Sequence, residues 1–381
     1  MKHICFIIHQ YANPIYPHAM NFLQNLAWKL KDLGHEVTII SPLAINITPK
    51  LLKVPYHIQE KTPNGNIINV YYPKTFSLGQ SHYIFGKSPV GITTRFMYKS
   101  ALKVIKREKI NPDIFYGHFL APSGMAVAKI AKKFNKPSFI AIGEAHDTIK
   151  QYGENKIKKN LQYVNGIIAV SSELKKYVTI QHNVYDPDKV IVLPNGYDED
   201  KFKYISKQEA REKLHLPQDD LIGCFVGAFN ERKGILRVCN AFEKIDSIKL
   251  ICAGYGPQQP FGKNLLLAKH IQPNEVSLLY YASDFFVLPT VAEGCCNAIV
   301  EAIGCGLPII SSNKPFNDDI LNDDYSIRID PNNEEEIVEA IKKISNDDLR
   351  KKMSEKSKEK AKELSLNNRA KKISNFIETN C

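Results

Sequence analysis

The 381 residues of this chain are 44% hydrophobic and 24% charged, a composition typical of a folded protein of two or three domains and not of a disordered chain. No run of 18 apolar residues occurs, which excludes a membrane-spanning helix, and the apolar run at the N-terminus is too short for a signal peptide. The eight cysteines show neither zinc-ligand nor paired spacing, so we expect reduced thiols in a cytoplasmic protein.

The net charge of +11 belongs entirely to the first half of the chain. Residues 1–200 contain 25 Lys and Arg against 14 Asp and Glu, whereas residues 201–381 contain 26 of each. A positive field draws a protein toward anionic partners, among them lipid, pyrophosphate and nucleic acid. The sequence therefore predicts that the first half meets an anionic partner.

Strand-like and helix-like segments alternate through the first 200 residues. This alternation predicts a parallel sheet with crossover helices. Helices are expected between the strands, for example over residues 19–33, 95–109 and 122–134. The predicted strands cover residues 4–8, 37–41, 69–72, 114–116, 139–142, 166–170 and 191–193.

A second alternating series follows a turn-forming link at residues 194–198, and a helical tail covers residues 334–380. We expect two Rossmann-like α/β domains that face a cleft, over residues 1–197 and 198–364, with a C-terminal helix near 365–381 that packs back on the first. Ligands of such sheets bind at the carboxyl ends of the strands. The strands predicted in the second domain cover residues 222–227, 249–253, 285–289, 308–311 and 326–329.

Two carboxylates lie eight residues apart directly after the predicted strand 285–289. Glu293 falls on a glycine-containing loop and Glu301 inside the helix that follows, which ends at Gly306. Asn297 lies four residues before Glu301 and so shares its helix face. Unpaired N–H groups at a helix N-terminus favour an anion such as a diphosphate, and carboxylates accept hydrogen bonds from sugar hydroxyls. The segment has the chemistry to hold a nucleotide sugar.

This segment resembles the donor-binding motif of the retaining glycosyltransferases of the GT-B fold in family 4, in which Glu-Gly precedes Glu-Ala by six residues and Gly-x-Pro follows. The matching residues are Glu293, Gly294, Glu301, Ala302, Gly306 and Pro308. The resemblance implies that Glu301 binds the ribose and that Glu293 binds the transferred sugar. It also implies that Cys295, Cys296 and Asn297, which lie between the two carboxylates, help to bind the donor.

The segment 225–234 resembles the family's Gly-Arg-x4-Lys-Gly loop through Gly227 and Lys233. The resemblance implies that Lys233 neutralises the leaving diphosphate. Ala228 stands where the family commonly has an arginine, and Arg232 is the candidate to supply that missing charge.

The turn at residues 253–257 resembles the family's Gly-x-Gly-Pro turn through Gly254 and Gly256. Glycine at both positions permits a close approach of the backbone to a ligand or a neighbouring loop. We therefore expect both glycines in the donor site.

Three histidines of the first half are candidates for the sugar or acceptor side of the site. His118 follows a predicted strand, and the resemblance implies a place near the sugar. His146 lies in Gly-Glu-Ala-His-Asp at residues 143–147, an altered form of a family motif. His18 belongs to the loop 13–20, which replaces the family's usual Gly-Gly loop.

The resemblance implies a hexosyltransferase that works with retention and without a metal ion or other cofactor. Its donor would be a UDP- or GDP-sugar, and its acceptor an oligosaccharide or a lipid-linked glycan. Such a reaction belongs to surface polysaccharide synthesis, for example of capsule or lipopolysaccharide.

The predicted helix 95–109 separates basic from apolar residues. An ordinary solvated helix shows the same pattern, but several basic helices in one domain favour binding to an anionic membrane surface. We therefore expect a peripheral protein on the inner face of the cytoplasmic membrane. The basic side holds Arg95, Lys99, Lys103, Lys106 and Lys109, and the apolar side holds Met97, Ala101, Val104 and Ile105.

Two other classes of function remain open at this stage. A nucleotide-sugar epimerase of the GT-B fold would bind the same donor and need no acceptor. A nucleic-acid-binding or base-modifying glucosyltransferase would explain the positive charge. The chain contains no basic run interleaved with aromatic residues, so no nucleic-acid partner is expected.

Overall fold

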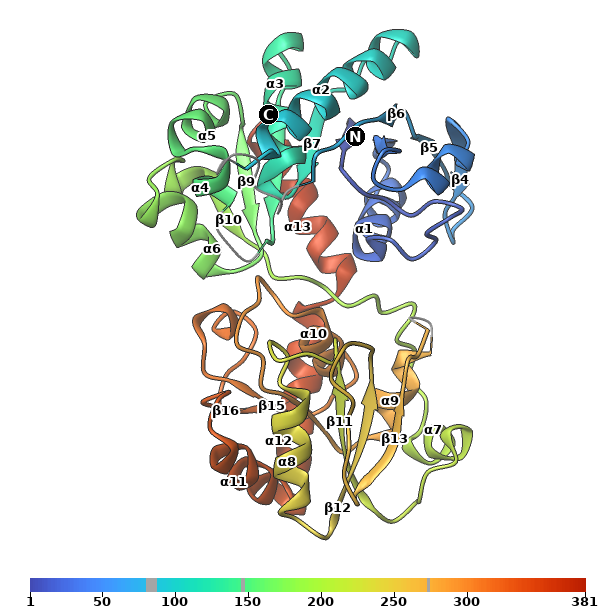
Figure 1. Ribbon diagram of the computed structural model, residues 1–381, viewed down its shortest axis with the longest axis vertical. Helices are drawn as coiled ribbons and strands as arrows, with labels where there is room; N and C mark the ends of the chain where they lie inside the picture. Colours follow the sequence, from blue (N-terminus) through green and yellow to red (C-terminus); the bar gives the residue numbers. More distant parts are fainter. Residues whose placement is uncertain (80–87, 145–147, 273–274) are drawn as a thin grey trace. The chain divides into compact units, whose positions relative to one another are not determined.

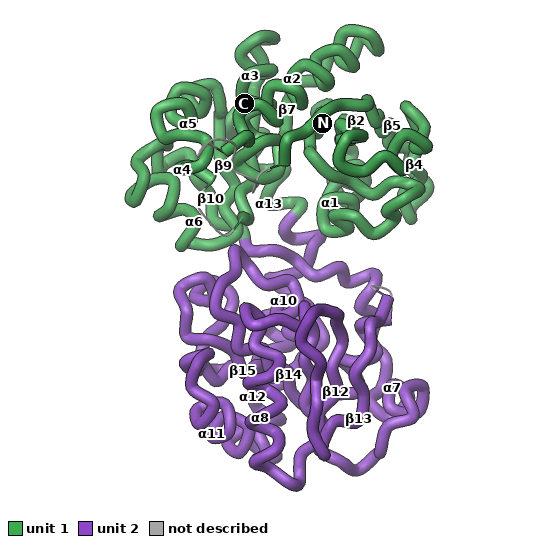
Figure 2. The backbone as a smooth tube through the Cα atoms, in the orientation of Figure 1, with its two compact units in different colours: residues 1–193, 370–381 green, residues 194–369 purple. Residues whose placement is uncertain are grey.

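The computed structural model describes residues 1–79, 88–144, 148–272 and 275–381. The chain forms two compact units, each built on its own sheet (Figure 1). Unit 1 contains residues 1–193 and 370–381, and unit 2 contains residues 194–369 (Figure 2).

Unit 1 is built on an eight-stranded sheet in the order β10-β9-β8-β7-β1-β2-β5-β4, in which β4 and β5 are antiparallel and the other neighbours are parallel. Strands β3 (Leu43–Ala44) and β6 (Lys74–Thr75) pair separately. The eight strands are β1 (His3–Ile7), β2 (Glu36–Ile40), β4 (His57–Lys61), β5 (Ile67–Tyr71), β7 (Ile114–His118), β8 (Ser138–Ile142), β9 (Gly166–Ala169) and β10 (Val190–Val192).

Helices cover both faces of this sheet because alternate residues of a strand point to opposite sides. Ile4 and Phe6 of β1 pack with residues of α1 and α13, whereas Cys5 and Ile7 pack with residues of α2 and α3. The α-helices of unit 1 are α1 (Asn21–Asp32), α2 (Val90–Arg107), α3 (Met125–Phe134), α4 (Thr148–Tyr152), α5 (Glu154–Leu161), α6 (Ser172–Lys176) and the end of α13 (Leu366–Thr379).

Unit 2 is built on a six-stranded parallel sheet in the order β13-β12-β11-β14-β15-β16. Its strands are β11 (Leu221–Val226), β12 (Ile248–Ala253), β13 (Leu265–Lys269), β14 (Phe285–Leu288), β15 (Ile309–Ser312) and β16 (Ser326–Ile329). Its helices are α7 (Lys207–Leu214), α8 (Ile235–Glu243), α9 (Val276–Ala282), α10 (Asn297–Gly304), α11 (Glu334–Ile344), α12 (Asp347–Glu363) and the first residues of α13.

Every strand predicted from the sequence is present, with ends that differ by at most two residues. The helical tail is divided into α11, α12 and α13. The domain boundary was predicted after residue 197, whereas unit 1 ends at Leu193. Unit 1 also includes Ala370–Cys381, in line with the C-terminal helix that was expected to pack on the first domain. No helix in the described residues is long and apolar enough to cross a bilayer.

Candidate functional site

Two glycine-containing loops meet at the carboxyl ends of β11 and β12. A Cβ atom on Gly254 would lie 1.9 Å from the carbonyl oxygen of Gly227, and one on Gly256 would lie 2.2 Å from that of Phe229. Only glycine allows this contact between the two backbones. The loop after β11 therefore lies directly on the loop after β12.

Lys233 lies at the end of the loop after β11 and is almost fully buried. Its Nζ lies 2.6 Å from Glu293 Oε1 and 3.6 Å from Cys296 Sγ. Burial alone would lower the pKa of the Lys233 ammonium, but the adjacent Cys296 sulfur and the Glu293 carboxylate outweigh burial and hold that pKa above its ordinary value. A buried cation therefore stands where the loop after β11 meets the loop before α10.

Arg232 binds the same carboxylate. Its Nη1 donates to Glu293 Oε1 at 2.5 Å and to the carbonyl oxygen of Ala292 at 2.7 Å. Thr290 Oγ1 donates to that carboxylate oxygen at 2.8 Å. One oxygen of Glu293 thus joins two cations and a hydroxyl. The Arg232 side chain is 44% exposed, so it has room to turn toward an anion.

Helix α10 begins immediately after the two cysteines of the motif. Cys295 and Cys296 are buried, and Asn297, the first residue of the helix, is exposed. Asn195 braces the loop, because its Nδ2 donates to the Cys295 carbonyl oxygen at 3.3 Å and to Asn297 Oδ1 at 2.8 Å. Gly306 ends the helix region with a φ of +78°, which favours glycine.

Glu301 is half-buried one turn along α10. Its Oε2 accepts a hydrogen bond from Tyr280 Oη at 3.0 Å. Burial raises the pKa of Glu301 to about 7, although the hydrogen bond from Tyr280 and the charge of Lys233 act in the opposite direction. This carboxyl is therefore partly protonated near neutral pH in the absence of a ligand.

The structure brings several of the predicted residues of unit 2 into contact. Lys233 lies against Gly227 and joins Glu293 to Cys296, and Arg232 binds Glu293. Gly294 is buried in the same loop. Positive side chains beside a helix N-terminus form a setting suited to a diphosphate. In the described residues, no group of three His, Cys, Asp or Glu is placed to bind a metal ion.

The three predicted histidines of unit 1 differ in their surroundings. His118 ends β7 and is buried, with its ring centroid 5.2 Å from that of Phe22 and 4.8 Å from that of Phe119. His18 is exposed on the loop before α1. His146 lies outside the described residues.

Sequence reasoning missed three polar residues in the segments around His118, namely His9, Ser123 and Glu144. The His9 backbone N–H and Nδ1 lie 3.0 and 3.2 Å from Ser123 Oγ, and burial lowers the pKa of His9 to about 4. Glu144 accepts hydrogen bonds from the backbone N–H of Leu120 at 2.5 Å and of Gly143 at 3.0 Å. The sequence could have indicated these residues, because each lies in a segment that follows a parallel strand, where ligands of such sheets bind.

The backbone between these groups is strained. Phe119 has φ 68° and ψ 145°, a region that side-chain-bearing residues rarely adopt. The Glu144 carboxylate holds the next residue, Leu120, through its N–H. Strained backbone tends to occur at functional sites, so the turn after β7 is the candidate site of unit 1.

Two protein families match complementary parts of the chain. The family described as "Glycosyltransferase Family 4" matches residues 20–201. The family described as "Glycosyl transferases group 1" matches residues 206–363, which include both glycine loops and both carboxylates of unit 2.

Relatives and solved structures point the same way. A teichuronic acid biosynthesis glycosyltransferase assigned in Bacillus subtilis is 25% identical over 88% of each chain. An Escherichia coli enzyme named UDP-Gal:alpha-D-GlcNAc-diphosphoundecaprenol alpha-1,3-galactosyltransferase is 27% identical over 68% of this chain and 73% of its own. The sucrose-phosphate synthase of Thermosynechococcus elongatus superposes with a TM-score of 0.78 at 17% identity, over 99% of this chain and 98% of that one. The fold is GT-B.

Proposed function

We propose that this chain, a glycosyltransferase of the GT-B fold and family 4, moves a hexosyl group from a nucleotide-diphosphate sugar to a glycan or lipid-linked acceptor, with retention of configuration. The observation that carries the proposal is the pair of cations, Lys233 and Arg232, held by Glu293 before the N-terminus of α10. Such an arrangement stabilises the charge that develops on a departing diphosphate.

In the proposed complex Lys233 and Arg232 form ion pairs with the diphosphate. Glu293, released from part of its ion pairing, accepts hydrogen bonds from hydroxyls of the transferred sugar. Glu301 accepts hydrogen bonds from the ribose in place of the one from Tyr280. Because two side-chain cations balance the diphosphate, no metal ion is needed in the proposal. The donor is a UDP- or GDP-sugar, and the name of the Escherichia coli relative supports UDP.

The proposed reaction takes place on one face of the sugar. The bond from the anomeric carbon to the diphosphate oxygen breaks, and the acceptor oxygen bonds to the same face of that carbon. The acceptor's hydroxyl proton passes to the leaving diphosphate, so no protein carboxylate forms a covalent intermediate. The side chains contribute positioning and charge stabilisation, with His118 placed near the sugar.

The acceptor is proposed to be membrane-bound, as in surface polysaccharide synthesis. The exposed side chains of α2 include Arg95, Lys99, Lys103 and Lys106, and no acidic group of the described residues forms an ion pair with them. Each Lys or Arg near an anionic bilayer contributes about 1 kcal/mol. The proposed location is the inner face of the cytoplasmic membrane.

The test is an assay of the purified protein with a panel of UDP- and GDP-sugars and a polyprenyl-diphosphate-linked acceptor. We expect one donor to support transfer in the presence of EDTA, with the donor's anomeric configuration kept in the product by NMR. The variant Glu293→Gln should retain nucleotide binding and lose turnover. An epimerised nucleotide sugar formed without acceptor, or an inverted product, would contradict the proposal.

A further inference from the structure

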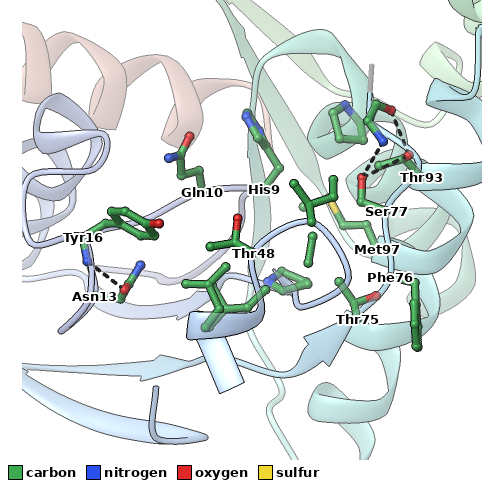
Figure 3. A pocket seen from close by; sticks show the side chains of 17 residues that line it. His9, Gln10, Asn13, Tyr16, Thr48, Thr75, Phe76, Ser77, Thr93 and Met97 are labelled. Carbon is green, nitrogen blue, oxygen red and sulfur yellow. Dashed lines mark hydrogen bonds between the residues drawn. The ribbon is translucent and has the colours of Figure 1, made fainter. Parts of the chain in front are cut away.

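A cavity of about 380 Å³ opens in unit 1, between the end of β1, the β3 and β6 segments and the first turns of α2 (Figure 3). Cavities that bind small ligands usually measure ~300–1,000 Å³, so a sugar unit fits here. Hydroxyl and amide groups lie on both sides, with Gln10 and Tyr16 on one and Thr75, Ser77 and Thr93 on the other. Among the described residues, no Lys, Arg, Asp or Glu lines the cavity. Its walls therefore suit an uncharged ligand that carries hydroxyl groups.

Several polar groups on the cavity wall are available to such a ligand. Thr93 is already used, because its Oγ1 donates to the Gly79 carbonyl oxygen at 3.1 Å and accepts from the Leu78 N–H at 3.2 Å. A sugar hydroxyl both donates and accepts, so it pairs with hydroxyl and amide groups alike. The lining side chains that form no hydrogen bond within the described residues include those of Gln10, Tyr16, Thr48 and Thr75.

His9 follows β1 and lines the same cavity, and a buried serine holds its ring. Ser123 Oγ accepts a hydrogen bond from the His9 backbone N–H at 3.0 Å and lies 3.2 Å from His9 Nδ1. Ser123 is fully buried, and within the described residues its hydroxyl proton has no acceptor except Nδ1. Because buried hydroxyls are hydrogen-bonded, Ser123 donates to Nδ1. The proton of the neutral imidazole is therefore on Nε2.

The Nε2–H group of His9 is the donor that this arrangement offers to a ligand. Nε2 has no partner in the part of the chain that the structure describes. Burial lowers the pKa of His9 to about 4, so the ring is neutral at neutral pH. A nitrogen that already carries a proton cannot take one from a substrate. His9 is thus suited to bind an oxygen atom and not to act as a general base.

The strained turn after β7 positions His9 and His118 together. The Phe119 ring lies 5.6 Å from the His9 ring and 4.8 Å from the His118 ring, centroid to centroid. Ser123 lies in the same turn, four residues after Phe119. His118 is the residue placed near the transferred sugar in the proposed function. His9 is therefore held beside the residue that marks the sugar.

We propose that His9 binds the sugar unit of the acceptor by donating its Nε2–H to a sugar oxygen, and that Ser123 is the positioning residue that fixes this tautomer. The sugar lies in the cavity, where the hydroxyl and amide side chains bind its other hydroxyls. The acceptor's reacting proton still passes to the leaving diphosphate, so no proton moves to His9. This inference rests on the proposed function and adds a residue that contacts the acceptor.

The tautomer is measured without any substrate. Long-range ¹H–¹⁵N correlation spectra of the full-length protein, labelled with ¹⁵N-histidine, show which ring nitrogen carries the proton, and the signals lost in His9→Gln identify His9. We expect a protonated Nε2 in the parent and a mixture of tautomers in Ser123→Ala. Ser138→Ala is the matched control, since Ser138 is equally buried in unit 1 but donates to the Tyr163 carbonyl oxygen at 2.9 Å. Protonated Nδ1 in the parent would overturn the inference.

Two substitutions of His9 measure the contact with the acceptor. The side-chain nitrogen of glutamine reaches the position of Nε2, whereas that of asparagine reaches only the position of Nδ1. His9→Gln should keep the acceptor KM within about threefold, and His9→Asn should raise it about tenfold, the scale of one lost hydrogen bond. The kcat at saturating acceptor should change little in either variant. The assay uses the donor and the polyprenyl-diphosphate-linked acceptor that support transfer in the panel above.

The serine variants complete the test. Ser123→Ala should raise the acceptor KM, and Ser138→Ala should leave it unchanged. UDP affinity should be the same in all variants, because the proposed donor residues lie in unit 2. Equal acceptor KM values in His9→Gln and His9→Asn, or a loss of kcat in both as for a missing base, would overturn the inference. If the tautomer is as expected but no nucleotide sugar supports transfer, the proposed function and the acceptor contact fail, while the role of Ser123 in fixing the tautomer stands.

Discussion

Glu293 Oε1 binds Lys233, Arg232 and Thr290 at once, so the two cations are already in place before a donor arrives. Lys233 is buried and Arg232 is not, which makes Lys233 the better preorganised of the two. We expect Lys233→Ala to lower kcat by about 100-fold, the scale of losing one preorganised charge-stabilising group. Steady-state kinetics with saturating donor would measure this effect.

Arg232→Ala is the companion variant, because it tests whether Arg232 supplies the charge that Ala228 lacks. We expect a smaller loss of kcat than in Lys233→Ala, since an exposed side chain is less rigidly held. Full activity in Lys233→Ala would remove the loop after β11 from the mechanism.

Glu301 gives a pH dependence with a definite sign. Burial raises the pKa of Glu301 from 4.5 to about 7, so the folded protein holds this proton more tightly than the unfolded chain does. The corresponding stabilisation is complete below about pH 4.5 and is lost as pH rises through about 7. We expect the melting temperature to fall less between pH 5 and pH 8 in Glu301→Gln than in the parent, because glutamine has no proton to lose over this range.

The same carboxyl is expected to contribute to nucleotide affinity. Glu301→Ala should weaken UDP binding by roughly 1–3 kcal/mol, as expected for a lost charge-assisted hydrogen bond. Tyr280→Phe, which removes the internal donor to Glu301 and leaves the carboxylate, serves as the control and should keep most of the affinity. Calorimetric affinities that do not change in Glu301→Ala would contradict the role assigned to this residue.

At the scale of elements, the contact between the loops after β11 and β12 allows no side chain. A Cβ on Gly254 would meet the backbone of Gly227 at 1.9 Å, so Gly254→Ala must move one of the two loops. We expect a loss of about 1–3 kcal/mol in the free energy of unfolding, typical of overpacking, together with weaker UDP binding. Denaturant unfolding followed by circular dichroism measures the first effect.

Gly91→Ala is the matched control for this substitution. Gly91 lies in the first turn of α2 with nothing within 4 Å of the added Cβ, so alanine should stabilise the protein by about 0.4–1 kcal/mol. If the free energy of unfolding falls in Gly254→Ala and rises in Gly91→Ala, the loss at Gly254 comes from the loop contact and not from alanine itself. Equal stability of Gly254→Ala and the parent would show that the loops can separate without cost.

The sequence predicted the central strands because residues buried on both faces form continuous apolar runs, as in Cys-Phe-Ile of β1. It missed β4, whose alternation of exposed and half-buried residues in His-Ile-Gln-Glu-Lys gives little apolar signal at a sheet edge. It likewise missed β13 at an edge of the second sheet, where every residue is half-buried or exposed.

For the candidate site, too, the sequence predicted some features and missed others. Motif spacing identified Glu293, Lys233 and Glu301, since loops of fixed length carry them. Asn195 could not be assigned a contact from its turn motif, because its partners lie 100 and 102 residues along the chain. The shared oxygen of Glu293 is likewise a matter of tertiary geometry, and spacing in the sequence contains no information about it.

At the scale of the whole molecule, the positive charge of unit 1 predicts binding to anionic bilayers. Replacing Lys99, Lys103 and Lys106 by Glu reverses the charge on the exposed face of α2 and should greatly reduce flotation with anionic vesicles. Flotation of the parent should increase with anionic lipid and decrease with added salt, because salt screens exposed charges.

The control is an equal change of charge in unit 2, with Lys342, Lys343 and Lys352 replaced by Glu, all of them exposed. This variant should float like the parent. Flotation that ignores lipid charge, or that falls equally in both variants, would contradict a membrane surface centred on α2.

Helix α13 starts in unit 2 and finishes in unit 1, and this has a consequence for biosynthesis. Ala370, Ile373 and Ile377 pack in the core of unit 1 with Ile4 and its neighbours, which emerge from the ribosome more than 360 residues earlier. Nascent domains generally fold in the order of their synthesis, at about 5–20 residues per second. Here the part of this sheet face that α13 covers stays exposed for about 9–35 seconds while unit 2 is translated, although α1 already packs on the same face. Chaperones that bind apolar surface therefore have their longest access to the half of the protein that is made first.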